Sequence, residues 1–287
     1  MIIDAHAHLW KKQNGIVNGK PVVDIGRGRS DFGGEERQMM PPYMTDGFNS
    51  VERFIANMDY AGVSGAVITQ EYIDGNQDEY LLACKGDRIK ICALYEEKAI
   101  GDVSGFDGIK ICASRLANRN LLDHIEPFVV ANKENKFISI DLADGDEQVS
   151  QMQEIITEFP NLKIAVGHFG MVTREGWQEQ IKLARNKNVF IESGGITWLF
   201  NEEFYPYPSA VRAINEASAL VGFEKLMWGS DYPRTMTAIT YKMSLDFIEK
   251  TKEISPESKA MLLGENARSF YGFGDLPIPL KIKNMVE

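Results

Sequence analysis

The sequence predicts a single α/β domain, residues 1–287, in which eight strands and their helices close into a (β/α)8 barrel of the TIM type. Short apolar runs of strand length recur along the chain, and amphipathic segments lie between most of them. The 287 residues suffice for one such barrel. An open doubly wound sheet is the alternative, but it calls for a Gly-rich phosphate loop after the first strand, where this chain has histidines.

The expected strands are apolar and bounded by turn residues. They are residues 2–7, 65–69, 89–94, 108–112, 137–142, 162–166, 189–192 and 225–228. Amphipathic segments predict helices between most of them, at residues 51–61, 121–135, 147–159, 173–186 and 210–221. For the first helix, Ser50 is the expected N-cap and Gly62 the stop. The connection after Tyr95 is too short for a full helix.

Residues 11–50 predict a long loop after the first strand, because they are rich in Gly, Pro and charged residues and show no helical or strand period. Loops longer than about 15 residues in a compact domain are usually lids or binding segments. Arg27, Arg29 and Arg37 could meet an anionic group of a substrate there. A solvated surface excursion is the equal alternative for each arginine.

Composition and charge favour a soluble globular protein with a small-molecule partner. A net charge of -10 and a pI of about 5.1 argue against nucleic-acid or anionic-membrane partners. The chain opens directly on a strand, and no apolar run is long enough to span a membrane, so we expect a cytoplasmic protein, with a homo-oligomer left open. Cys84, Cys92 and Cys112 form no CxxC pair and are expected to be reduced core thiols.

The first strand carries a histidine pair. Side chains alternate along a strand, so His6 and His8 project from the same side, with Asp4 on that face as well. Neutral imidazoles there can bind a divalent cation. A pair of merely hydrogen-bonded histidines is the alternative. Only four histidines occur in the chain, which favours the functional interpretation of two placed together.

Other polar residues follow the expected strands, where active sites of such barrels lie. These residues are Gln70, Glu71, Tyr95, Glu96, Asp141, His168, Glu192, Ser193 and Asp231. On the fourth strand, isoleucines packed under helices would turn Lys110 into the barrel. His124 lies in an expected helix, away from this pattern, and is interpreted as structural.

Three motifs resemble the amidohydrolase superfamily, specifically its amidohydrolase-2 branch. They are Ile-Asp-Ala-His-Ala-His at the start, Val-Gly-His-Phe-Gly around His168 and Leu-Met-Trp-Gly-Ser-Asp-Tyr-Pro around Asp231. Residues 67–70, 79–82, 108–110 and 140–142 are similar to those of sugar-acid lactonases and the pyrone-dicarboxylate lactonase. The resemblance implies a TIM-type barrel that hydrolyses a cyclic ester, with His6, His8, His168 and Asp231 at its centre and Asp231 as the base that activates water.

The sequence departs from two branches of this superfamily. Metal-dependent decarboxylases have a histidine after strand 5, where this chain has Asp141. Binuclear members need that histidine and a carboxylated lysine on strand 4, and only Lys110 matches. We therefore expect a single divalent ion, zinc or manganese, on His6, His8 and Asp231, and no organic cofactor. A metal-free site, in which these residues bind the substrate carbonyl directly, is the alternative.

The expected function is hydrolysis of a small lactone, of a sugar acid, with Asp231 and His168 as catalytic residues. Lys110, Arg234, Asp141 and Tyr232 are expected to bind the substrate. Aromatic residues after strands 7 and 8 are expected to wall the pocket, namely Trp198, Tyr205, Tyr207 and Tyr232. The alternatives are a metal-dependent decarboxylase or hydratase of the same superfamily, and a sugar-acid-binding barrel without catalysis.

Overall fold

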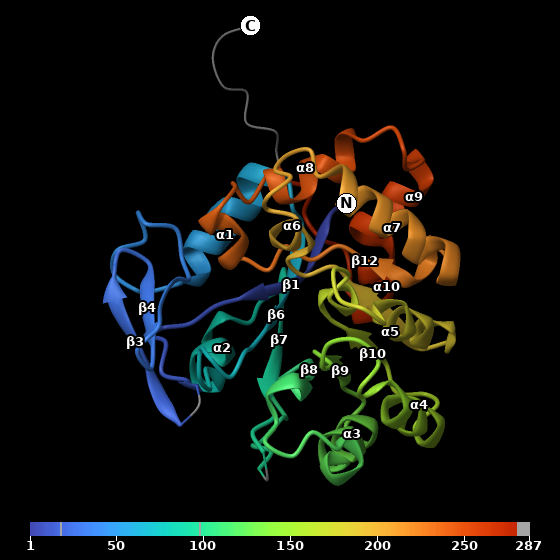
Figure 1. The fold of residues 1–287 in the computed structure, drawn as a ribbon, viewed down its shortest axis with the longest axis horizontal. Coiled ribbons are helices and arrows are strands. Elements are labelled where there is room, and N and C mark those ends of the chain that lie inside the picture. The colour runs from blue at the N-terminus through green and yellow to red at the C-terminus, as the bar shows by residue number, and fades with distance from the viewer. Residues whose placement is uncertain (18, 98, 280–287) are drawn as a thin grey trace, which may run out of the picture.

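Eight parallel strands form a barrel in the computed structural model of the chain, which describes residues 1–17, 19–97 and 99–279 (Figure 1). The strands are β1 (Ile3–His8), β6 (Gly65–Thr69), β7 (Ile89–Leu94), β8 (Gly108–Ile111), β9 (Phe137–Ile140), β10 (Ile164–Val166), β11 (Val189–Glu192) and β12 (Leu226–Met227). They pair in sequence order, as a (β/α)8 barrel requires. The predicted fold class is therefore confirmed.

Hydrogen bonds between β1 and the segment after β12 close the barrel. The amide of Ala5 donates to the Trp228 carbonyl at 2.9 Å, and the amide of His8 donates to the Tyr232 carbonyl at 2.8 Å. In return the Asp231 amide donates to the His6 carbonyl at 2.9 Å. Backbone bonds thus place the first motif of the chain beside the last.

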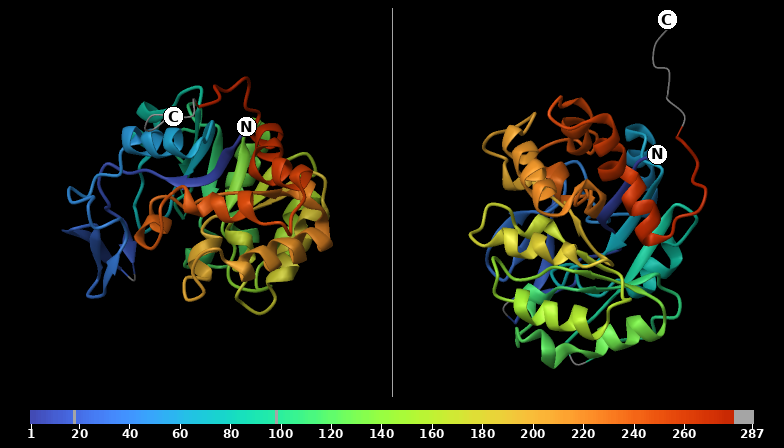
Figure 2. Two further views of the ribbon diagram at one scale, coloured as in Figure 1. Left: turned by 90° about the horizontal axis from the view of Figure 1, so that it is seen from above. Right: turned by 90° about the vertical axis from the view of Figure 1, so that its right-hand side faces the viewer.

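Helices surround the barrel, as the two further views in Figure 2 show. They are α1 (Val51–Ala61), α2 (Asp78–Cys84), α3 (Glu126–Lys133), α4 (Val149–Glu158), α5 (Trp177–Lys182), α6 (Ile196–Leu199), α7 (Pro208–Val221), α8 (Met243–Lys250), α9 (Pro256–Ala260) and α10 (Asn266–Tyr271). No helix lies in the described residues between β7 and β8, which confirms the short connection after Tyr95. None of the described helices is long and apolar enough to cross a membrane.

Helix α1 follows its sequence signals closely. The Ser50 side chain accepts a hydrogen bond from the Arg53 amide, and Gly62 ends the helix in the left-handed conformation at φ 79°. Phe54, Met58 and Ala61 share one face and are buried. Two other predicted helices are shorter than expected, because residues 121–124 and 183–185 form 3-10 turns next to α3 and α5.

The region predicted as a loop, residues 11–50, contains a four-stranded antiparallel sheet, so that prediction was wrong in part. The strands are β2 (Ile16–Val17), β3 (Lys20–Gly26), β4 (Arg29–Phe32) and β5 (Glu36–Gln38). This appended sheet projects to one side of the barrel (Figures 1 and 2). Its strands are largely solvent-exposed, and they therefore lack the apolar alternation that reveals a strand in sequence.

The core lies between the barrel strands and the helices. The three cysteines are free and buried, as predicted. Several strands end one or two residues before their predicted limits, because the chain leaves the ladder at the mouth of the barrel. Strand β9 ends at Ile140 and β8 at Ile111. Asp141 consequently stands directly after its strand, facing the other strand ends.

Candidate active site

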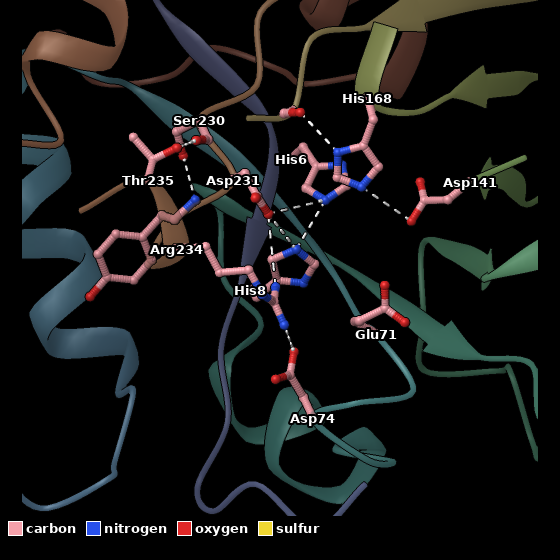
Figure 3. Close-up of polar contacts among 12 residues, drawn as sticks. His6, His8, Glu71, Asp74, Asp141, His168, Ser230, Asp231, Arg234 and Thr235 are labelled. Carbon is pink, nitrogen blue, oxygen red and sulfur yellow. Dashed lines mark hydrogen bonds and ion pairs between the residues drawn. The ribbon is translucent and has the colours of Figure 1, made fainter. Parts of the chain in front are cut away.

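Two histidines of β1 converge at the carboxyl end of the barrel. The register of β1 against β6 shifts between Asp4 and Ala7, and the Nε2 atoms of His6 and His8 lie 3.0 Å apart. Both side chains are buried. The predicted pairing of the two imidazoles is therefore present in the structure (Figure 3).

Asp231 completes a cluster with this pair. Its Oδ1 lies 2.9 Å from His8 Nε2 and 3.8 Å from His6 Nε2. Its other oxygen, Oδ2, accepts a hydrogen bond from Trp198 Nε1 at 2.8 Å. The residue has a positive φ of 58°, a costly backbone conformation for a non-glycine residue that brings its side chain over β1.

Glu192, at the end of β11, fixes the ring of His6. The Oε1 atom of its buried carboxylate lies 2.6 Å from His6 Nδ1. With Nδ1 turned to this carboxylate, Nε2 is the ring nitrogen that His6 directs at the cluster. The sequence places Glu192 among the polar residues at strand ends but predicts no role for it. The signal was its position at the same barrel edge as Asp231.

Two glycines pack closely against His6, Gly194 against its ring and Gly229 against its Cβ atom and backbone. A Cβ atom on Gly194 would lie 2.8 Å from His6 Cγ, and one on Gly229 would lie 2.7 Å from His6 Cβ. Both positions also approach Glu192 closely. Any side chain at either glycine would therefore displace His6, and the ring is held by packing as well as by its hydrogen bond.

Asp4 does not join the cluster, although β1 alternation predicted it on the same face. Because the strand is irregular after Asp4, its carboxylate turns to the Ser230 hydroxyl at 2.6 Å and the Tyr241 hydroxyl at 2.8 Å. Burial raises the pKa of Asp4 to about 6, against the opposing effect of these hydrogen bonds. Asp4 thus ties β1 to the segment that carries Asp231.

The His6, His8 and Asp231 cluster fits a divalent cation. Each residue offers one ligand atom, and these atoms all lie within 4.8 Å of one another. In a tetrahedral zinc site with ligands about 2.0–2.1 Å from the ion, neighbouring ligand atoms are about 3.4 Å apart. The three observed separations, 3.0, 2.9 and 3.8 Å, scatter around that value. Imidazole and carboxylate are also donors that zinc and manganese accept.

A second row of charges lies beside the cluster. Lys110 Nζ is 2.6 Å from Asp141 Oδ1, and Asp141 Oδ2 is 3.4 Å from His168 Nε2. The other ring nitrogen of His168 donates to the Gly194 carbonyl at 2.8 Å. Both ring nitrogens of His168 therefore face acceptors, which suits a doubly protonated imidazolium.

The pKa shifts agree with this charge pattern. Burial alone would lower the pKa of His168, but the Asp141 carboxylate raises it to about 10. Burial opposes ionisation of Asp141, yet Lys110 and His168 hold its pKa well below the usual range. His168 is accordingly a cation at neutral pH in this arrangement, and a cation is a poor metal ligand.

The cluster itself combines neutral imidazole with a carboxylate. Burial, followed by the charge of Arg234, lowers the pKa of His8 well below its ordinary value, so that His8 is neutral near pH 7. Burial would raise the pKa of Asp231, but the His8 hydrogen bond and the charges of His8, Arg234 and His168 lower it overall. Asp231 is therefore an ionised carboxylate.

A cavity of about 470 Å³ opens over these groups. Its lining combines residues from the barrel mouth with residues from the appended sheet: His8, Glu71, Arg115, Asp141, His168, Trp198, Asp231 and Arg234, with Arg37, Gln38 and Met39. Of the three arginines singled out in residues 11–50, Arg37 lines the cavity, whereas Arg27 and Arg29 do not. This volume suits a small molecule.

Some residues expected to contact substrate do not reach the cavity. Tyr232 is buried with its ring 4.7 Å from that of Phe54 on α1, because adjacent residues point in opposite directions and Asp231 takes the cavity side. Tyr205 and Tyr207 do not line the cavity either. Lys110 points into the barrel, as predicted, but is fully buried and contacts Asp141 instead of the cavity.

His124 has the structural role expected of it. Its Nδ1 accepts a hydrogen bond from the Tyr95 hydroxyl at 2.9 Å, and its Nε2 donates to the Asn118 carbonyl at 2.7 Å. Both nitrogens are thereby satisfied by neighbours that do not belong to the cluster around Asp231.

A barrel with paired histidines on its first strand and an aspartate after its last strand is the arrangement that the sequence motifs predict for an amidohydrolase. Residues 3–273 match the model of the amidohydrolase family, and the chain therefore belongs to this family, in its amidohydrolase-2 branch. It is an enzyme of the hydrolase type. Among curated proteins, no relative matches the chain.

Solved structures share the fold at low sequence identity. A probable 2-pyrone-4,6-dicarboxylic acid hydrolase from Acinetobacter baumannii, with citric acid bound, is 19% identical with a TM-score of 0.71, covering 95% of this chain and 99% of that one. An amidohydrolase from Burkholderia multivorans with bound zinc is 15% identical with a TM-score of 0.68, covering 96% and 100%. A 5-carboxyvanillate decarboxylase from Novosphingobium aromaticivorans, complexed with manganese and a nitrobenzoic acid, is 16% identical with a TM-score of 0.54, covering 78% and 81%.

Proposed function

We propose that this enzyme opens a small lactone, of a sugar acid, by attack of a water molecule that Asp231 activates. The observation that carries the proposal is the Asp231 carboxylate, which lines the cavity and is held in place by His8 at 2.9 Å and Trp198 at 2.8 Å. A carboxylate that remains ionised at a cavity wall has the protonation state that a general base requires. A structure that shares the fold is that of a probable 2-pyrone-4,6-dicarboxylic acid hydrolase. A 2-pyrone is itself a cyclic ester, which supports the proposal.

In the proposed reaction, Asp231 accepts a proton from water as the water oxygen attacks the lactone carbonyl. The ring carbon–oxygen bond then breaks, and the leaving oxygen takes up a proton to give the open hydroxy acid. General-base assistance of this kind typically contributes about 10² to 10⁴ in rate. The carboxylate needs no reorientation during the step, because both of its oxygens already have fixed partners.

Cationic groups around the cavity would bind the substrate and the developing negative charge. The His168 imidazolium, supported by Asp141, lines the cavity next to the His6 ring, with ring centroids 4.7 Å apart. Arg234 lines the wall beside Asp231 and offers N–H donors to hydroxyl or carboxylate groups. Lys110 acts through Asp141, since it does not reach the cavity.

His6, His8 and Asp231 would hold one divalent cation, zinc or manganese. When bound, such an ion supplies Lewis-acid polarisation of the carbonyl and lowers the pKa of water. Glu192 then orients His6, as a carboxylate behind a metal-binding histidine commonly does.

A screen of sugar lactones with a pH indicator tests the proposal, because each ring opening releases a proton. The screen is run with and without chelator, and with Asp231→Asn as the matched inactive variant. We expect acid release from at least one lactone by the wild type and none by the variant. Binding of sugar acids without any turnover would instead favour a barrel that only binds its ligand.

A metal-dependent decarboxylase is the second candidate. It is favoured by the cation-compatible cluster and by the fold shared with the manganese-containing 5-carboxyvanillate decarboxylase. Release of carbon dioxide from aromatic or sugar carboxylates, strictly dependent on added metal, would establish it. Proton release from lactones without formation of carbon dioxide would instead support hydrolysis.

A further inference from the structure

A chain of buried polar side chains runs from the appended sheet toward Asp231. The hydroxyl of Ser30, on β4, donates to Oε1 of Gln13. The Nε2 of Gln13 donates to Oδ1 of Asp74 at 2.7 Å. Ser30, Gln13 and Asp74 are all buried. Because Ser30 occupies the amide oxygen, the amide nitrogen of Gln13 is directed at Asp74.

The chain continues to Arg234, which lies between two carboxylates. Its Nη2 contacts Asp74 Oδ2 at 2.7 Å, whereas its Nη1 stands 3.8 Å from Asp231 Oδ1 (Figure 3). The first distance is that of a charge-assisted hydrogen bond, and the second is not. Arg234 is thus bonded to Asp74, which does not line the cavity, and is held away from Asp231, which does.

The position of Arg234 affects what Asp231 can do. A guanidinium in direct contact would occupy Oδ1, the same oxygen that faces His8 and His6. That oxygen would then be less available to a cation or to a proton from water. Loss of the Asp74 charge would leave Asp231 as the nearest carboxylate to this mostly buried guanidinium.

We propose that Asp74, oriented by Gln13 and Ser30, is a positioning residue that keeps Arg234 from closing onto Asp231. The proposal rests on the role proposed for Asp231, but it concerns a different set of residues. The appended sheet contributes to the active site through this chain, in addition to the cavity residues that β5 supplies.

Crystal structures of the wild type and of Asp74→Asn provide the first test. We expect the Nη1 to Oδ1 distance to shorten from 3.8 Å in the wild type. In the variant it should become about 2.9 Å, the length of a direct ion pair. An Arg234 that stays in its original place would overturn the proposal. Both crystals are grown from chelated protein, because a cation on Asp231 Oδ1 would itself repel Arg234. This comparison is decisive whether or not the lactonase assignment is correct.

Cation affinity provides the second test, measured by competition between the protein and a chromophoric zinc chelator. We expect Asp74→Asn to weaken zinc binding about tenfold or more, in the range seen for residues that support metal ligands. The double variant Asp74→Asn/Arg234→Gln should recover most of the affinity, because it removes the cation that closes onto Asp231. A purely structural role for Asp74 predicts no recovery, and that result would contradict the proposal.

Two further variants serve as controls, one within the same chain of hydrogen bonds and one at a carboxylate elsewhere in the protein. Gln13→Leu removes one hydrogen bond from Asp74 without touching either ion pair, and should shift zinc affinity in the same direction by a smaller factor. It also replaces Asp74→Asn if that variant does not fold. Asp246→Asn removes a carboxylate of α8 that is paired with Lys242 and Lys250, and should leave zinc affinity within twofold of the wild type. Equal losses in Asp246→Asn and Asp74→Asn would refute a specific role for Asp74.

Discussion

The Nδ1 atom of His6 lies 2.6 Å from the Oε1 atom of Glu192, although the two residues are 186 positions apart in the chain. This contact selects the nitrogen with which His6 faces His8 and Asp231. It connects β1 to β11 across the mouth of the barrel, so that the ring orientation of a residue on the first barrel strand depends on the seventh.

Replacing Glu192 with Gln should weaken cation binding about 10- to 100-fold, because the amide offers His6 a less basic acceptor and can present its NH2 group instead. Isothermal titration with zinc measures the effect. Thermal unfolding serves as the control, since the isosteric change preserves side-chain volume. Unchanged affinity in a folded variant would show that Glu192 does not set the state of His6.

Replacing Asp231 with Asn should abolish turnover of a lactone substrate. The amide keeps the shape of the carboxylate but cannot accept the proton, and loss of a general base usually costs about 10² or more in kcat. Steady-state kinetics and ligand binding are compared on the same preparation, and we expect binding and unfolding temperature to remain close to those of the wild type. A variant that kept more than about a tenth of the rate would exclude Asp231 as the base.

Chelation should remove a single divalent ion, and restoring zinc or manganese should reload it. We expect His6→Ala to lose the ion and His168→Ala to keep it, because His168 is paired with Asp141 and lies in the second row of charges. Elemental analysis of the three proteins gives the answer. Two ions per chain, or an ion lost solely in His168→Ala, would contradict the assignment of ligands.

In the chelated protein, His168 should stay doubly protonated at neutral pH and release a proton only as the pH approaches about 10. Its pKa is raised, so the cation is present below that pH and is lost above it. Nitrogen NMR of the imidazole ring measures the transition, with Asp141→Asn expected to move it to lower pH. A transition near the ordinary value of 6.5 in both proteins would disprove the ion pair.

Replacing Tyr232 with Phe should leave KM unchanged within twofold, since the ring packs on α1 and does not line the cavity. The buried hydroxyl has no hydrogen-bond partner among the described residues. Removing such a group is neutral or stabilises a fold by about 1 kcal/mol. Denaturant unfolding and kinetics report the two effects separately, and a large rise in KM would return Tyr232 to the substrate site.

The barrel could be predicted because each strand is a buried apolar run between clear breaks, and the cluster because His6, His8 and Asp231 all stand at strand ends. Tyr232, expected to bind the substrate, points away from the cavity, and its position next to Asp231 in the chain implies this. The appended sheet escaped prediction for a different reason. Its turn glycines, such as Gly26 and Gly28 with positive φ, were visible in the sequence, but its exposed strands carry little hydrophobic pattern.

The contacts that support the cluster could not be predicted in the same way. Glu192 and Asp74 carry no local motif, and their partners His6 and Arg234 are distant in sequence. Such pairings join residues at or after the ends of different strands. They become visible when the strands are placed around a common axis.

The glycines at 194 and 229 restrict how this enzyme can diversify. With a β-carbon at either position within 3 Å of His6, evolution cannot reshape that side of the pocket one residue at a time without losing the histidine. The opposite wall, where β5 contributes Arg37 and Gln38, is exposed and carries no such restriction. New substrate preferences, in nature or in a directed library, should therefore arise from the appended sheet, while the histidine side is inherited unchanged.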